Sequence, residues 1–323
     1  MSNKIKYDDI FAFHPGYYIS ELIDDMCISQ AEFAARMGTT AKTLSKLLNG
    51  QCRLSDDLAL KIATMLGSSV DVWLNLQKTY DEKVLEIEHR KSINAQITIM
   101  KKMDYSYFEK IAKLPAAQNV TDKIANLCKC LMVSDLRILQ HHDFLVNYRT
   151  AISNVQEKNI INSRAWIQIA LNQAKNMKVS PFDAEKLKGY LPEIRKMTIQ
   201  NPDIFLPRLR KIFSECGVAF VLLPHLKNSA INGAVKWYGH SQVVLAVNDR
   251  RLYADTFWFS LFHEIKHVLQ QKVKTVFVSG NEDIADIEKS LEEEADVFAQ
   301  NYLIPKNEYK NLKAQANENS KQI

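Results

Sequence analysis

The residues best suited to chemistry form one short run, His263-Glu264-Ile265-Lys266-His267. On a helix, His263 and His267 lie at i and i+4 and face the same way, so their imidazole nitrogens are able to bind one Zn²⁺ ion. Glu264 lies beside them, where it is placed to take a proton from an attacking water molecule. The residues on both sides of the run, from Trp258 to Leu269, are strongly apolar, so we expect this helix to be buried.

A catalytic zinc site takes three protein ligands and keeps one open position. The third ligand is expected from the acidic run Glu292-Glu293-Glu294-Ala295-Asp296. Glu292 shares a helical face with Ala295 and Ala299, whose small side chains permit a close helix approach, so we predict Glu292 to be the ligand. Asp296, one turn on, is expected to hydrogen-bond a ligand histidine. For Glu293 and Glu294 we expect solvation at a helix N-terminus, where the dipole favours acidic side chains.

A second functional pattern covers Ser29–Gly50, which reads as two short helices joined by a turn at Gly38. Ser29 and Thr40 are predicted N-caps, and Leu44, Leu47 and Leu48 give the second helix a buried face. This is the pattern of a helix-turn-helix, whose second helix enters the DNA major groove. The alternative from periodicity alone is a helical bundle with a solvated lysine face.

The predicted DNA contacts lie at the two helix N-termini and on the exposed face of the second helix. Short polar side chains at helix N-termini commonly hold phosphates, and lysines reach phosphates or guanine edges. Residues Ser29–Arg53 hold four basic side chains and one acidic one, so a local positive patch exists. The contact residues are Gln30, Thr40, Ala41, Lys42, Ser45 and Lys46.

The elements that position these residues are mostly helical, because the 323 residues include only 9 glycines and 8 prolines. We expect a DNA-binding domain of five short helices over 1–85, a helical connector domain over 86–200 and an α+β domain over 201–323. The fifth short helix is predicted over Val70–Leu76. Three apolar runs predict a small antiparallel sheet, and two helices are expected after it, at about 253–271 and 287–303. The three runs are Val218–Leu223, Ala234–Trp237 and Val243–Val247.

Composition excludes several classes of protein. No apolar run is long enough to span a membrane, and the start of the chain is polar, so we expect a cytoplasmic protein. The net charge of +5 is small, so DNA contact depends on the local patch. Five cysteines are an odd number, which argues against a secreted disulfide scaffold. Cys128 and Cys130 are expected to be buried thiols, and the adjacent His141 and His142 diverge too far on a helix to share a metal.

The N-terminal segment resembles the HigA-family antitoxins of the Xre-type helix-turn-helix class. The resemblance rests on His14-Pro15-Gly16, Ser29-Gln30, Leu47-Leu48-Asn49-Gly50, Ala59-Leu60 and Trp73-Leu74-Asn75-Leu76-Gln77. It implies a bacterial homodimer that binds a palindromic operator and represses its own operon, often beside a gene for a RelE-like toxin.

The C-terminal segment resembles the ImmA/IrrE family of metallo-endopeptidases. The resemblance rests on FWFSLFHEIKHVL and EEEADVFAQNYLIP, with GVAFVLLPHL, INGAVKW, VVLAVNDRR and PFDAEKLKGYLPEIRKMT before them. It implies a zincin-like domain that hydrolyses peptide bonds with Zn²⁺, Glu264 being the general base. His240, Tyr253 and Tyr302 are candidates for stabilising the oxyanion, and Ala234–Trp237 for holding an extended substrate. Lys266 stands where this family usually has glycine, and we expect it to dampen turnover but not metal binding.

Two functions follow from these features. One is a DNA-binding regulator that cleaves a repressor or partner protein through its zinc domain. The other is a non-proteolytic antitoxin and autorepressor whose metal domain senses, scaffolds or binds a toxin. The two differ only in turnover, and the intact motif with Glu292 and Asp296 favours the first.

Overall fold

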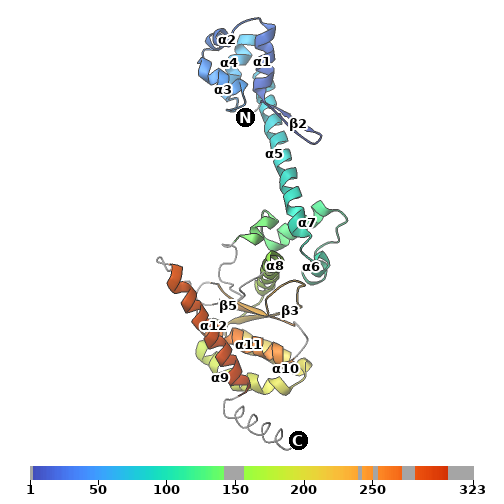
Figure 1. Ribbon diagram of the computed structural model, residues 1–323, viewed down its shortest axis with the longest axis vertical. Helices are drawn as coiled ribbons and strands as arrows, with labels where there is room; N and C mark the ends of the chain where they lie inside the picture. Colours follow the sequence, from blue (N-terminus) through green and yellow to red (C-terminus); the bar gives the residue numbers. More distant parts are fainter. Residues whose placement is uncertain (1–2, 142–155, 239–241, 250–253, 271–280, 305–323) are drawn as a thin grey trace, which may run out of the picture. The chain divides into compact units, whose positions relative to one another are not determined.

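The computed structural model describes residues 3–141, 156–238, 242–249, 254–270 and 281–304 (Figure 1). It is mainly helical, as expected. The chain divides into two compact units, residues 1–95 and 96–323, with the division inside one long helix. Of the connector expected over 86–200, residues 86–95 belong to the first unit. The rest packs with the C-terminal segment in the second unit, where the Tyr107 hydroxyl donates a hydrogen bond to the Pro224 carbonyl at 2.6 Å. None of the described helices combines the length and apolar character needed to cross a bilayer.

The first unit begins with a β-hairpin and continues with helices around one core. The helices begin as their caps predict: the Ser29, Thr40 and Ser55 side chains accept hydrogen bonds from the backbone N–H groups of Glu32, Thr43 and Leu58. The core is centred on Phe33, Leu44, Leu47 and Ile62. The elements are β1 (Lys4–Tyr7), β2 (Ile10–Phe13), α1 (Pro15–Asp25), α2 (Gln30–Arg36), α3 (Ala41–Leu48), α4 (Asp56–Leu66) and α5 (Val70–Met100).

Two expectations for this unit are corrected. The fifth helix does not end at Leu76 but runs to Met100, because no glycine or proline interrupts residues 70–100. The hairpin of β1 and β2 was not expected. Its inner face, which includes Ile10 and Ala12, packs against Ile87 of α5, and that contact far along the chain supports two strands too short to be stable alone.

The second unit has a three-stranded sheet covered by helices. Within it, α8 lies on one side of the sheet and α11 on the other (Figure 1). A core of α9, α10 and α11 side chains packs on the sheet, with Phe213, Leu245 and Phe262 among its buried members. Its elements are α6 (Tyr105–Ile111), α7 (Val120–Leu131), η1 (Leu136–Gln140), α8 (Glu157–Ala174), α9 (Ala184–Lys196), η2 (Met197–Ile199), α10 (Pro202–Glu215), β3 (Val218–Leu223), β4 (Gly233–Tyr238), β5 (Gln242–Asn248), α11 (Ala254–Leu269) and α12 (Asn281–Leu303).

The sheet is mixed, which corrects the expectation of an antiparallel one. The strand order is β3-β5-β4, with β3 parallel and β4 antiparallel to β5. β5 is buried at every position from Val243 to Asn248. The strand with the longest unbroken buried run therefore takes the centre, where both of its edges are paired, and β4 lies at an edge of the described sheet.

Candidate metal centre and DNA-binding face

Helix α11 presents the two histidines because its other faces are buried in the core. Leu261, Phe262 and Ile265 have no exposed side-chain surface, whereas the His263 and His267 side chains are each 17% exposed. Helix α12 packs beside α11 with Ala295 and Ala299 fully buried. The small residues thus occur where a close helix approach was expected.

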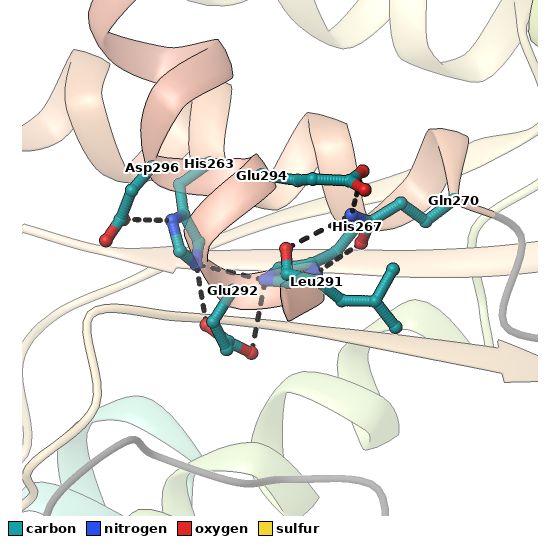
Figure 2. A network of polar contacts seen from close by, with 7 residues as sticks. All are labelled: His263, His267, Gln270, Leu291, Glu292, Glu294 and Asp296. Atoms are coloured by element: carbon teal, nitrogen blue, oxygen red, sulfur yellow. Dashed lines mark hydrogen bonds and ion pairs between the residues drawn. The ribbon is translucent and has the colours of Figure 1, made fainter. Parts of the chain in front are cut away.

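The structure brings His263, His267 and Glu292 together (Figure 2). The two Nε2 atoms lie 3.0 Å apart, and the Glu292 carboxylate oxygens lie 3.3 Å from Nε2 of His263 and 3.4 Å from Nε2 of His267. A tetrahedral zinc ion with bonds of roughly 2.0–2.1 Å needs its ligand atoms about 3.3 Å apart. The donor set and its spacing therefore fit Zn²⁺.

The surrounding carboxylates have distinct electrostatic roles. Burial by itself raises the pKa of Glu292, but hydrogen bonds from His263 and His267 outweigh it and lower that pKa to about 2. Burial lowers the pKa of His263, but its hydrogen bond to Glu292 and the nearby carboxylates raise it overall. Asp296 Oδ1 lies 2.9 Å from His263 Nδ1, so Asp296 orients that ring with Nε2 toward Glu292.

Glu264 is buried, with 8% of its surface exposed, and it lies against the first residue of β4. A Cβ atom on Gly233 would lie 2.6 Å from Cγ and 2.7 Å from Oε1 of Glu264, closer than real Cβ contacts. Burial raises the pKa of Glu264 to about 7, which suits a group that accepts and returns a proton near neutral pH. Gly233 was not predicted, although a glycine within a strand often marks a close approach.

Two further residues differ from expectation. Lys266 turns toward α12, where its Nζ lies 3.2 Å from Glu294 Oε2 and 6.0 Å from the Phe298 ring centroid. Glu294 is therefore paired with a lysine and not simply solvated. Gln270 was not predicted at all, yet its Oε1 lies 2.9 Å from His267 Nδ1. Its spacing of i+7 from His263 and i+3 from His267 was the available signal.

Of the three oxyanion candidates, the structure describes only Tyr302. The Tyr302 ring stacks on Phe262 and Phe298, with centroid distances of 5.5 and 4.7 Å, which is a packing role. His240 and Tyr253 lie outside the described residues, as does His142. Cys128 and Cys130 are half-buried, and burial raises the pKa of both thiols.

A pocket of about 530 Å³ opens beside the candidate metal centre. The Phe259 ring in its wall lies 6.3 Å from the His263 ring, and Asn232 in its wall precedes Gly233. Most of the surface that lines the pocket is apolar, and Trp258 in its wall is 3% exposed. The remaining lining residues are Thr198, Ala254, Asp255, Thr256, Ser260, Leu303 and Ile304.

The predicted DNA contacts of the first unit are exposed to solvent. Leu44, Leu47 and Leu48 of α3 face the core, which leaves the opposite side of the helix to solvent. Thr40 caps this helix, with Oγ1 3.1 Å from the Thr43 amide nitrogen. All six predicted contact residues are exposed: Gln30, Thr40, Ala41, Lys42, Ser45 and Lys46.

Comparison with known proteins places a different domain type on each unit. A helix-turn-helix family model matches residues 26–73, and a model of the IrrE N-terminal-like domain matches residues 221–320. The chain is 34% identical over 86 residues to the uncharacterized HTH-type transcriptional regulator YddM of Escherichia coli (strain K12), which covers 25% of this chain and 92% of that protein. It is 36% identical over 61 residues to antitoxin HigA-1 of Vibrio cholerae, which covers 19% of this chain and 57% of that protein.

A solved structure is also similar in sequence. An addiction module antidote protein of the HigA family from Coxiella burnetii is 28% identical, over 26% of this chain and 92% of that chain. The TM-score of the superposition is 0.25.

Proposed function

Because the chain belongs to the HigA-like helix-turn-helix transcriptional regulators and carries an IrrE N-terminal-like domain, we propose that it is a regulator with a zinc-dependent endopeptidase domain. Its substrate is a repressor or partner protein. The observation that carries the proposal is the tetrahedral spacing of the His263, His267 and Glu292 donor atoms beside a buried Glu264.

The residues of the site divide the reaction between them. Zinc, when bound by His263, His267 and Glu292, supplies a positive charge that polarises the substrate carbonyl and makes water more acidic. Glu264 takes the proton of the attacking water and returns it to the leaving amine, which its pKa of about 7 favours. Asp296 holds the His263 ring in place.

The substrate is an extended polypeptide with an apolar side chain. β4 is an edge strand whose first residue, Gly233, touches Glu264, so a peptide added along that edge passes the catalytic carboxylate. The pocket beside Phe259 and Trp258 then takes an apolar side chain next to the cleaved bond.

The first unit supplies the regulatory function. Its exposed α3 residues and the helix-turn-helix match support binding to an operator in the promoter of its own gene, as a homodimer on a pseudo-palindrome. The similar HigA-1 protein of Vibrio cholerae is an antitoxin, and we extend that role to this chain. Its second protein partner is then a toxin encoded by a neighbouring gene.

The decisive experiment compares wild type with Glu264→Gln, expressed beside the neighbouring genes. Glu264 is not a ligand, so the variant keeps zinc and the fold but loses the proton acceptor. We expect mass spectrometry to find fragments of one DNA-binding partner or of the chain itself in wild type only. Identical fragment profiles under every stress applied would support the non-proteolytic antitoxin and autorepressor instead.

A further inference from the structure

A chain of side-chain contacts outside the ligand set ends on His267 (Figure 2). Gln270 Oε1 lies 2.9 Å from His267 Nδ1, and Gln270 Nε2 lies 3.1 Å from the Leu291 carbonyl oxygen and 3.4 Å from Glu294 Oε2. Lys266 Nζ lies 3.2 Å from the same Glu294 oxygen. Helices α11 and α12 are therefore joined by polar contacts directly behind a candidate zinc ligand.

The chemistry of these groups allows one arrangement of hydrogens. The Leu291 carbonyl and the Glu294 carboxylate only accept hydrogen bonds, so the NH₂ group of Gln270 must face them. Its carbonyl oxygen then faces His267, and Nδ1 of that ring must carry the proton. A zinc ligand must be neutral, and in the neutral ring this leaves the lone pair on Nε2, the atom that lies 3.4 Å from Glu292 Oε1.

Lys266 forms an ion pair with Glu294, the carboxylate that accepts a hydrogen bond from the Gln270 amide. Gln270 directly follows the last residue of α11, and its backbone N–H donates a hydrogen bond to the Lys266 carbonyl at 2.9 Å. Glu294 and Phe298 lie one turn apart on α12. The Lys266 side chain is 26% exposed and contacts both α12 residues through an ion pair and a cation–π contact. The position at which this chain departs from the family pattern thus has a partner within the site.

We propose that Gln270 is a positioning residue that fixes the zinc-binding tautomer of His267, and that the Lys266–Glu294 pair sets the orientation of its amide. The inference rests on the proposed zinc site. It does not depend on turnover, because a correct tautomer is needed for metal binding whether or not a peptide is cleaved.

The test measures zinc affinity of the full-length chain after chelation, by competition with a fluorescent zinc chelator. Loss of a hydrogen bond to a ligand histidine typically costs about 10–100-fold in metal affinity, and we expect that loss in Gln270→Leu. The Co²⁺-loaded variant should also show shifted visible absorption bands. Glu293→Gln, an exposed position on α12 next to Glu292, is the control, and its zinc affinity should stay within about twofold of wild type.

A charge swap separates orientation from simple ion pairing. Lys266→Glu with Glu294→Lys restores the pair but presents a donor to the NH₂ group of Gln270. We expect the swap to keep the thermal midpoint of wild type and to bind zinc at least about fivefold more weakly. A zinc affinity of the swapped protein equal to that of wild type would overturn the role of Glu294 as the acceptor for the Gln270 amide.

The remaining outcomes are also decisive. Zinc affinity of Gln270→Leu within twofold of wild type overturns the role of Gln270. If circular dichroism shows that Gln270→Leu does not fold, Gln270→Asn, whose amide is too short to reach His267, replaces it with the same expectation. A wild-type chain that binds neither Zn²⁺ nor Co²⁺ overturns the zinc site and the inference together, whereas bound zinc without proteolysis counts only against the endopeptidase function.

Discussion

Three groups decide whether the second unit holds a metal: the imidazoles of His263 and His267 and the carboxylate of Glu292. Their donor atoms all lie within 4.8 Å of one another, although Glu292 comes from a different helix. Glu293 is the next residue along α12, but it does not belong to the group of described side chains that could hold a metal ion. We therefore expect different roles for these two adjacent residues of one helix.

This contrast predicts the effect of removing each ligand. Purified wild type should carry about one zinc ion per chain, and His263→Ala, His267→Ala or Glu292→Ala should remove it, because two protein ligands are too few. Glu293→Ala should keep the metal. Metal content is measured by atomic emission after gel filtration, and full zinc retention in Glu292→Ala would refute its assignment as a ligand.

Gly233 predicts a second effect at this scale, on the catalytic base. A methyl group there would lie 2.6 Å from Glu264 Cγ, so Gly233→Ala must displace the carboxylate. General-base catalysis is worth roughly 10²–10⁴-fold, so we expect turnover to fall by at least about tenfold while zinc content is unchanged.

The matched control for that experiment is Gly189→Ala in α9. A Cβ atom at Gly189 meets nothing within 4 Å, so turnover should remain at the wild-type level. The readout is the rate of fragment formation from the protein substrate. Equal rates in Gly233→Ala and wild type would show that the displaced carboxylate does not act as the base.

At the scale of elements, α3 combines a buried apolar face with an exposed polar one. Leu44, Leu47 and Leu48 bind it to the core, and Lys42 and Lys46 lie one turn apart on the opposite side. A close contact fixes its position, because a Cβ atom at Gly16 of α1 would lie 2.1 Å from the Leu47 carbonyl oxygen. α3 is therefore held closely against α1 while its polar face stays exposed.

We therefore predict that Lys42→Ala and Lys46→Ala each weaken binding to a promoter fragment of the chain's own gene. If each lysine contacts a phosphate, its loss should reduce the slope of log affinity against log salt by roughly 0.9. Lys61→Ala, on α4 and paired with Asp57, is the control. Fluorescence anisotropy over a salt series gives the slopes, and unchanged slopes for both α3 variants would exclude phosphate contacts there.

The start of α1 predicts a dependence on pH. His14 is 2% exposed, and its Nδ1 accepts a hydrogen bond from the Gly16 amide at 3.0 Å. Burial lowers its pKa below the ordinary value of 6.5, although the Cys52 backbone and Asp81 oppose this. The folded state therefore favours the neutral ring, and its stabilising effect is present above pH 6.5 and is lost as the pH falls below that value.

We expect amide hydrogen exchange in α1, corrected for intrinsic rates, to become faster between pH 7.5 and 5.5. His14→Asn keeps a capping acceptor that does not titrate. Its exchange should be faster than in wild type at pH 7.5 but should change less with pH. The same pH response in both proteins would assign the effect to another group.

At the scale of the whole molecule, the chain has two units with separate cores. The predicted DNA contacts lie in the unit of residues 1–95, and the candidate zinc ligands lie in the unit of residues 96–323. Changes to the site in one unit should therefore leave the other folded, and Glu264→Gln should bind operator DNA as wild type does.

The proposed pseudo-palindrome predicts a stoichiometry for the complete chain. Two copies should bind one operator duplex, because each half-site takes one recognition helix. Sedimentation velocity with a labelled duplex measures the mass of the complex. A complex containing one chain at saturating protein would exclude the homodimer on DNA.

The sequence determined those features that depend on neighbours along the chain. Caps such as Ser29 and Thr40 and the apolar periodicity of α3 and α11 act over one or two helical turns, so the helices and the common face of His263 and His267 follow from local rules. Glu292 is likewise predicted as a ligand from its near neighbours, because it shares a helical face with the small residues Ala295 and Ala299. The assignment of these residues to zinc remains a prediction.

Only the tertiary structure decided which distant groups meet. Gly233 lies against Glu264, Gln270 reaches the Leu291 carbonyl, and Lys266 pairs with Glu294. β5 takes the centre of the sheet and α5 continues past Leu76. The physical reason is that these outcomes depend on how strands and helices pack to bury apolar surface, and periodicity within a single segment does not specify its partner across space.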